Sequence, residues 1–222
     1  MTEAFHVTLE QAPAAAGPRK MSNAALRTLF LAIEQVMGEN GIKAVLNFGG
    51  LKRFINNYPA NNLREDVSYA DYGEAQQAVE DFYGPRGARA FMLRIGRATF
   101  RYALEEQPAI LGLAGLALKL LPPETRMKLI LKRMAHGAGE TLNMPVEVED
   151  QPEYFVYVVK DCPCRFRKRS LKTPCCYVSV GGLMEAMRWA TGAEHNVTEF
   201  TCINLGDDAC RYRVEKKVSE QK

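Results

Sequence analysis

The chain has 222 residues, of which 47% are hydrophobic and 25% are charged, and its formal net charge is +3. Such a composition is typical of a soluble globular protein. A chain of this length can bury a core without disulfides or metals to stabilise it, and the net charge is too small to argue for a nucleic-acid partner.

Two segments of the chain indicate the compartment in which we expect the protein. Residues 1–20 contain no continuous apolar core of the kind that an export signal carries, so we expect a disordered lead-in. Residues 109–121 form the most apolar run, but it is shorter than the ~20 residues that span a bilayer and it contains Lys119. We expect a buried helix there, no membrane span, and a cytoplasmic protein in which disulfides are rare.

The first part of the chain is predicted to be helical. Apolar side chains recur at helical spacing in residues 23–38, 40–58, 68–83, 88–105 and 123–141. Ser22 or Asn23 can cap the first helix, and Pro123 suits the first turn of the last one. Gly49-Gly50 divides the second segment into two short helices, and the sequence GPRG separates the third segment from the fourth.

The last third of the chain is predicted to form a sheet. Strand-forming Val, Tyr, Phe and Thr residues are concentrated in residues 146–150, 153–161, 196–203 and 209–217. A helix over about residues 175–191 lies between the two pairs of strands, which gives the order β-β-α-β-β. We therefore expect one α+β domain over residues 21–218, with a helical part (21–144) packed on a small antiparallel sheet that also carries a metal site (145–218).

Four residues of the sheet part form a candidate metal site. Cys202 ends one strand and Cys210 begins the next, so their thiols face each other across a turn. Glu199 is three positions before Cys202, and the two reach one site only if the strand is bulged or ends near Cys202. Cys176, at the start of the preceding helix, can supply the fourth ligand, because the helix N-terminus favours a thiolate. Three thiolates and one carboxylate in a closed tetrahedral shell suit zinc.

The remaining cysteines leave alternatives open. Spacing alone is a weak signal, because no CxxC pair is present, and buried free cysteines that pack as small hydrophobic side chains are the competing interpretation. Cys162 and Cys164 lie outside the predicted shell, whereas Cys175 can replace its neighbour Cys176 after a one-residue shift. Alternatively, Cys162, Cys164 and Cys175 belong to an iron–sulfur cluster or a redox switch.

The spacing of the four candidate ligands resembles that of a known family. The pattern CxxxxG begins at Cys176, and ExxCxxxGDxxC runs from Glu199 through Cys202 to Cys210. Together they are similar to the 4-vinyl-reductase domain family, which includes ligand-sensing domains of bacterial phenol and aromatic-hydrocarbon regulators and a bacteriochlorophyll-biosynthesis protein. The resemblance covers about residues 160–214. The stretch FMLRIGRATFRYAL is similar, more loosely, to the Gly-centred helix of that family.

The resemblance implies a fold, a metal and a ligand. The fold would be similar to that of TRAPP subunits and of haem-based nitric-oxide sensors. A zinc ion would be held by Cys176, Glu199, Cys202 and Cys210, and an apolar ligand (an aromatic hydrocarbon, a lipid or a tetrapyrrole-like molecule) would lie between helices and sheet. We also expect a homodimer. On the residues alone, plain core packing competes with such a pocket.

Two residues correspond by position to the ligand contacts of phenol sensors in the family. His136 is the counterpart of their histidine, although a core or surface histidine is the ordinary interpretation. Phe155 is nearest to the position of their tryptophan. The only tryptophan here, Trp189, lies late in the last helix and does not match, which argues against phenol itself as the ligand.

The sequence favours a binding module over an enzyme. It contains no GxSxG, no P-loop, no HExxH and no GxGxxG after a predicted strand. The resemblance leaves open an accessory protein or a reductase in bacteriochlorophyll or tetrapyrrole metabolism, although no nicotinamide or flavin site is visible. A cysteine-based redox or iron–sulfur sensor is the third alternative.

Overall fold

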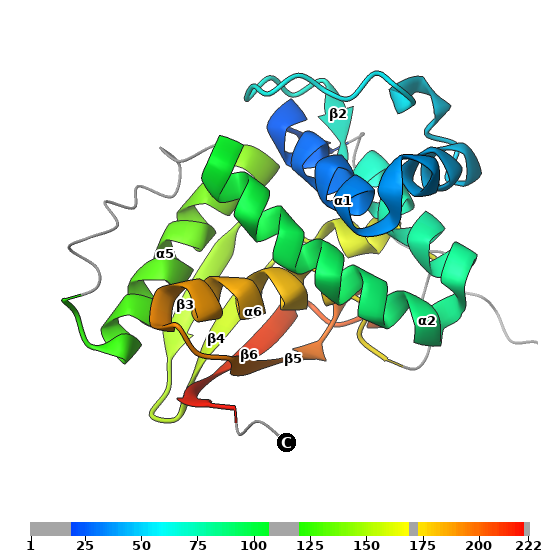
Figure 1. The fold of residues 1–222 in the computed structure, drawn as a ribbon. Coiled ribbons are helices and arrows are strands. Elements are labelled where there is room, and N and C mark those ends of the chain that lie inside the picture. Colours follow the sequence, from blue (N-terminus) through cyan, green and yellow to red (C-terminus); the bar gives the residue numbers. More distant parts are fainter. Residues whose placement is uncertain (1–18, 107–119, 169–172, 220–222) are drawn as a thin grey trace, which may run out of the picture.

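A computed structural model describes residues 19–106, 120–168 and 173–219 (Figure 1). The expected lead-in over residues 1–20 lies outside these ranges up to residue 18, and the expected apolar helix over residues 109–121 lies outside them up to residue 119. Within the described ranges, none of the helices combines the length and the apolar character that crossing a bilayer requires.

Two long bent helices make up the N-terminal half. Helix α1 (Asn23–Phe48) begins after Ser22, whose Oγ accepts the backbone N–H of Ala25 at 3.3 Å. It bends at Gly38, where φ is +77°, and a short 3-10 turn, η1 (Lys52–Phe54), follows it. Helix α2 (Tyr69–Glu106) bends at Gly84, where φ is +69°. Glycine adopts this conformation readily. The backbone is non-helical at both glycines, so each marks a kink between two helical segments, as expected from the glycine positions.

The C-terminal half is built on a four-stranded antiparallel sheet. Its strands are β3 (Val146–Asp150), β4 (Tyr154–Val159), β5 (His195–Thr201) and β6 (Cys210–Val218). Their order is β3-β4-β6-β5, so the last strand lies between β4 and β5 and joins the two predicted hairpins into one sheet. A second, two-stranded sheet pairs β1 (Lys20–Met21) with β2 (Val67–Ser68).

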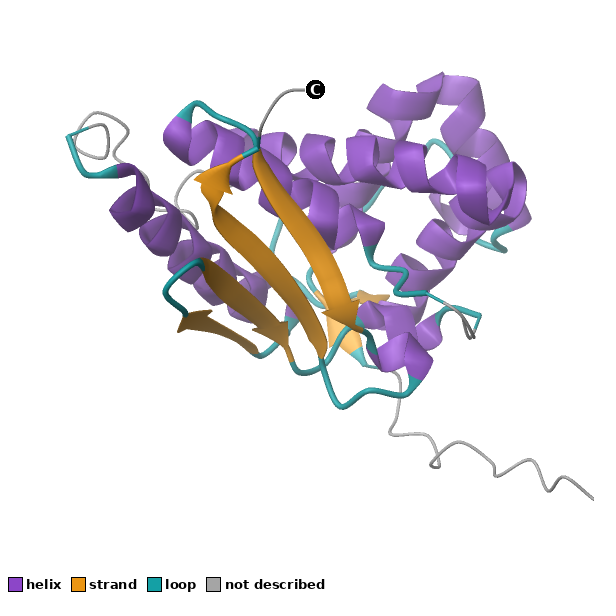
Figure 2. Cartoon of the chain, turned by 90° about the horizontal axis from the view of Figure 1, so that it is seen from below, coloured by secondary structure: helices purple, strands orange, loops and turns teal. Residues whose placement is uncertain are grey.

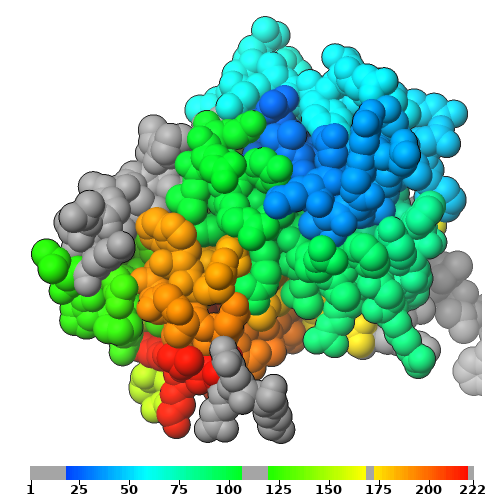
Figure 3. Space-filling model, in the orientation of Figure 1, coloured from blue at the N-terminus to red at the C-terminus, as the bar shows by residue number. Residues whose placement is uncertain are grey.

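Helices cover one face of the four-stranded sheet (Figure 2). Helix α5 (Pro123–Leu142) and helix α6 (Tyr177–Thr191) contribute buried side chains to the same core as β4 and β6. Helices α1 and α2 carry a second core next to it. Helices α1, α2 and α6 share one face of the molecule (Figure 3). The expected architecture, a helical N-terminal half with a small antiparallel sheet, is confirmed.

Glycines allow α2 and α6 to pack backbone against backbone. A Cβ atom added at Gly96 would lie 2.1 Å from the carbonyl oxygen of Val178, and one added at Gly181 would lie 2.1 Å from that of Leu93. No side chain fits such a separation, so both positions require glycine. This close approach holds the N-terminal end of α6 next to α2, and α6 begins at the cysteine residues of the candidate site.

Candidate functional site

All six cysteines are buried and unbonded to one another. They come from four segments that are separated in the sequence. Cys162 precedes and Cys164 lies in the short turn η2 (Pro163–Phe166); Cys175 and Cys176 precede α6; Cys202 follows β5; and Cys210 begins β6. The fold therefore collects every thiol of the chain at one end of the sheet.

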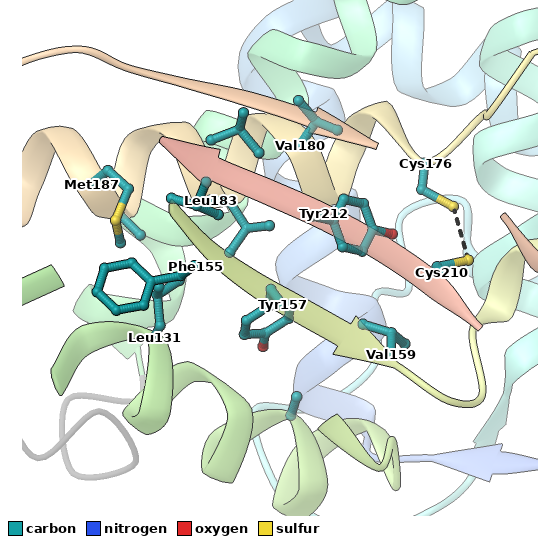
Figure 4. Packing of buried hydrophobic residues seen from close by; sticks show 14 of the residues in the cluster. Leu131, Phe155, Tyr157, Val159, Cys176, Val180, Leu183, Met187, Cys210 and Tyr212 are labelled. Carbon is teal, nitrogen blue, oxygen red and sulfur yellow. Dashed lines mark hydrogen bonds between the residues drawn. The ribbon is translucent and has the colours of Figure 1, made fainter. Parts of the chain in front are cut away.

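The sulfur atoms lie in contact with one another. Cys176 Sγ is 3.8 Å from Cys162 Sγ and 3.9 Å from the sulfur atoms of Cys202 and Cys210. Cys164 Sγ is 3.5 Å from Cys210 Sγ and 4.0 Å from Cys202 Sγ. These separations are far longer than the ~2.05 Å of a disulfide bond. Figure 4 shows Cys176 and Cys210 facing each other beside the end of β4.

The strand irregularity that the predicted metal site requires is present. The register between β5 and β6 shifts between Glu199 and Thr201, and β5 ends at Thr201. Glu199 and Cys202 consequently reach the same site, although they are three positions apart. Glu199 Oε2 accepts the backbone N–H of Cys176 at 2.8 Å. The carboxyl group of Glu199 thus connects the end of β5 to the start of α6.

Three overlapping sets of four residues bring their ligand atoms within 4.8 Å of one another. One is the predicted set: Cys176, Glu199, Cys202 and Cys210. The second is Cys162, Cys164, Cys176 and Cys210, and the third is Cys164, Cys175, Cys176 and Cys202. Zinc in any of them stays a prediction.

The expectation that Cys162 and Cys164 lie apart from the site needs correction. Strands β4 and β6 are neighbours, and Val159 at the end of β4 pairs with Cys210 at the start of β6. The residues that follow β4 therefore arrive next to Cys210. The spacing of the cysteines did not predict this, because the order of the strands in the sheet depends on tertiary pairing. The one sequence signal was that two closely spaced cysteines directly follow a predicted strand.

Burial and neighbouring thiols shift the ionisation of the site in opposite directions. Burial, followed by the charge of Cys202, raises the pKa of Glu199 to about 9. Hydrogen bonds from the thiols of Cys164 and Cys175 lower the pKa of Cys202. Cys202 is thereby favoured as a thiolate, the form that binds metals. Glu199 Oε1 is buried without a hydrogen-bond partner among the described residues.

An apolar cavity of about 210 Å³ lies between α1, α2, α5, α6 and β4. Its wall consists mainly of aliphatic and aromatic side chains, with six hydroxyl-bearing residues: Thr28, Tyr72, Thr99, Thr141, Tyr157 and Ser179. Two of these hydroxyls donate within their own helices, Thr99 to Gly96 and Thr141 to Gly137. The wall is therefore apolar with a small number of hydrogen-bonding groups, as in small-molecule sites.

The two tyrosines in the wall have hydroxyls that make no hydrogen bond to another described residue. Burial raises the pKa of Tyr157 above its ordinary value, and it does the same for Tyr72. Both hydroxyls therefore stay protonated at neutral pH. Each can donate to, or accept from, a polar group in the cavity.

The cavity and the cysteine cluster share a wall. Tyr72 lines the cavity, and after burial the charges of Cys162 and Cys176 are the next causes that raise its pKa. Val159 also lines the cavity and pairs with Cys210. The cluster is thus one residue away from the cavity.

The two predicted ligand contacts lie elsewhere. The His136 side chain is 61% exposed on α5, and its Nε2 lies 3.3 Å from Glu140 Oε1. Phe155 is fully buried near Leu131 and Met187 (Figure 4), with the Lys216 ammonium 4.6 Å from its ring centre. Neither residue is among those that line the cavity. Phe155, Tyr157 and Val159 share one face of β4, and of these three Tyr157 and Val159 line the cavity. His136 and Phe155 as ligand contacts stay predictions.

No family model and no curated protein matches this chain. Several solved structures do. One is an oxygen-binding H-NOX domain related to soluble guanylate cyclases (TM-score 0.55, 16% identity, 91% of this chain and 99% of that chain). Another is an H-NOX protein from S. oneidensis in the Fe(II)NO ligation state (TM-score 0.51, 12% identity, 85% of this chain and 97% of that chain). A third is the phenol-responsive sensory domain of the transcription activator PoxR with phenol (TM-score 0.50, 14% identity, 69% of this chain and 77% of that chain).

These matches confirm the expected likeness to the fold of haem-based nitric-oxide sensors. The resemblance to the 4-vinyl-reductase domain family is wrong, because no family model matches and the similar solved structures include H-NOX domains and the PoxR sensory domain. Its motif consisted of a few cysteines and glycines around one hairpin. Gly206 in that hairpin has a φ of +105°, so the turn itself requires glycine, whatever the family.

Proposed function

We propose that this chain is a small-molecule-binding sensory domain whose cavity takes a single-ring aromatic molecule and whose cysteine cluster holds zinc. The observation that carries the proposal is the apolar cavity between the helices and β4. Its volume of about 210 Å³ exceeds the ~150 Å³ of an engineered cavity that binds benzene. It is smaller than the ~300–1,000 Å³ of sites for drug-sized ligands.

The phenol in the PoxR structure supports a ligand of this size and chemistry. The position of Trp189 counted against phenol only through the 4-vinyl-reductase resemblance, which is wrong. A phenolic hydroxyl that enters an apolar cavity needs a hydrogen-bond partner. Burying such a hydroxyl without a partner costs about 1–3 kcal/mol in proteins. The protonated hydroxyl of Tyr157 on β4 supplies one, and the hydroxyl of Tyr72 on α2 supplies another. The aliphatic wall accommodates the ring.

Haem, which the descriptions of H-NOX structures name, fits this cavity poorly. A porphyrin is larger than a drug-sized ligand, whereas the cavity lies below the drug-sized range. Tyrosine and methionine side chains line it, but no described histidine does: His136 is largely exposed, and His195 directs Nδ1 to the carbonyl of Glu215. We therefore assign no haem chemistry to this chain.

Zinc in the cysteine cluster would be structural. Each of the three candidate sets fills four positions with protein ligands and leaves none for water or substrate. The ion would join the start of α6 to the β5–β6 hairpin, and so fix the end of the sheet that borders the cavity. The expected homodimer stays a prediction, which analytical ultracentrifugation can test.

Calorimetric titration with phenol tests the cavity. We expect one phenol per chain with a Kd on the order of 100 µM, given the few atoms that the ligand offers. Ala103→Phe fills the cavity from α2 and should abolish binding. The matched control is Ala90→Phe on the exposed face of the same helix, which should bind as the unaltered chain does.

Two results would contradict the proposal. One is phenol binding that Ala103→Phe leaves unchanged while the variant keeps its fold by circular dichroism. The other is stoichiometric haem binding, seen as a shifted Soret band, by a chain that ignores phenol.

A further inference from the structure

We propose that the cysteine cluster holds two zinc ions, bridged by the thiolates of Cys164 and Cys176. This inference deepens the metal part of the proposed function and rests on it. Two of the three candidate sets consist only of cysteines, and they share Cys164 and Cys176. The first set adds Cys162 and Cys210 as terminal ligands, and the second adds Cys175 and Cys202.

The two sets together account for every cysteine of the chain. Each metal receives two terminal and two bridging thiolates, so both are four-coordinate, as zinc prefers. A single zinc would leave at least two of the six sulfur atoms without a metal, although all six are buried and in contact. Six thiolates with two bridges are the ligand set of known binuclear zinc modules.

The sulfur separations fit zinc. A zinc–sulfur bond of ~2.3 Å in a tetrahedron places its ligand sulfurs about 3.8 Å apart. Six sulfur pairs within these two sets are 3.5–4.0 Å apart. All ligand atoms of each set lie within 4.8 Å of one another. Cys175 Sγ, outside the predicted shell, lies 3.9 Å from Cys202 Sγ. An iron–sulfur cluster places iron and inorganic sulfide between the cysteines and so spreads their sulfur atoms further apart.

The surroundings suit a negatively charged thiolate cluster. The backbone N–H of Ile203 donates to Cys210 Sγ at 3.4 Å. The guanidinium of Arg167, whose side chain is 1% exposed, donates to the carbonyl oxygen of Cys175 at 2.7 Å and also pairs with the Glu80 carboxylate. Six thiolates and two Zn²⁺ ions carry a net negative charge, which donors such as the N–H of Ile203 stabilise.

Glu199 is a positioning residue in this arrangement. It belongs to neither of the all-cysteine sets, and its Oε2 holds the backbone N–H of the bridging residue Cys176. The single-zinc alternative instead makes Glu199 a ligand. Glu199→Gln separates the two, because a glutamine can accept the same N–H bond but is a poor zinc ligand.

Native mass spectrometry of the full chain, loaded with Zn²⁺ under reducing anaerobic conditions, measures the stoichiometry. We expect two zinc ions per chain and two in Glu199→Gln. Cys162→Ser and Cys175→Ser each remove one terminal ligand and should retain one zinc. Cys176→Ser removes a bridge and should lose both. ¹¹³Cd NMR of the unaltered chain needs no variant, and it should show two resonances in the all-thiolate range.

One zinc per chain, lost in Glu199→Gln, would overturn this inference and leave the single zinc of the proposed function intact. Iron with acid-labile sulfide, or no metal at all, would overturn both metal assignments. The phenol titration is read separately, so a failure of the cavity is distinguishable from a failure of the cluster.

Discussion

At Gly96 one methyl group decides whether α2 and α6 can pack as they do. Gly96→Ala would place a Cβ atom 2.1 Å from the carbonyl oxygen of Val178, so the helices must separate. We expect a loss of about 1–3 kcal/mol in the free energy of unfolding, the usual cost of overpacking, measured by urea titration. The control is Gly139→Ala in α5, where nothing lies within 4 Å, and it should gain up to about 1 kcal/mol. Equal stability of the two variants would refute the close approach.

Tyr157 is expected to provide the hydrogen bond to a phenolic ligand. Tyr157→Phe keeps the ring in the cavity wall and removes the hydroxyl. We expect phenol to bind about fivefold more weakly, which corresponds to ~1 kcal/mol for one hydrogen bond, while toluene binds as before. Tyr154→Phe on the same strand, outside the lining, serves as the control. If both ligands lose affinity equally, the hydroxyl has no specific role.

At the scale of elements, an ion-pair network joins α2 to α6 and to the turn after it. Arg97 lies 3.0 Å from Glu185 and 2.8 Å from Glu194. The Glu185 side chain is only 4% exposed. Its burial alone would raise its pKa, but hydrogen bonds from Arg188 and Arg97 outweigh burial and leave the pKa below the ordinary value.

The lowered pKa of Glu185 predicts a pH-dependent stability difference. A carboxyl with a depressed folded-state pKa stabilises the fold above its unfolded pKa of about 4.3 and loses that contribution as the pH falls through the folded value. Glu185→Gln should therefore lower the melting temperature near neutral pH, and the gap from the unaltered chain should narrow below about pH 4. Glu140→Gln, at a half-exposed carboxyl on α5, is the control. A gap that widens in acid would contradict the assignment.

Some elements followed from local sequence and others did not. The bends at Gly38 and Gly84 were predictable, because glycine marks a break whatever surrounds it. The order of the strands was not, because the pairing of Val159 with Cys210 joins two segments with α6 between them in the chain. Local spacing and turn geometry were enough to group Cys176, Glu199, Cys202 and Cys210. They could not predict that Cys162 lies beside this group, because its position depends on the order of the strands. The cavity wall draws on five elements, so no single periodicity revealed it.

At the scale of the whole molecule, metal and sheet should be coupled. The cluster connects η2, the start of α6, the end of β5 and the start of β6. Because metal binding contributes directly to folding free energy, a zinc chelator should lower the melting temperature. It should also speed amide hydrogen exchange around Cys176 and in the β5–β6 hairpin more than in α1. Uniform acceleration over the chain, or none, would contradict the coupling.

The central claim is that a single-ring aromatic molecule occupies the cavity between the helices and β4. Anomalous diffraction from crystals grown with 4-bromophenol tests it most directly, because the bromine marks the position of the ring. The account predicts one bromine peak inside the cavity and the phenolic oxygen within hydrogen-bond distance of Tyr157 or Tyr72, at about 2.5–3.0 Å. A bromine peak only on the outer surface, or a cavity filled by its own side chains, would contradict the claim.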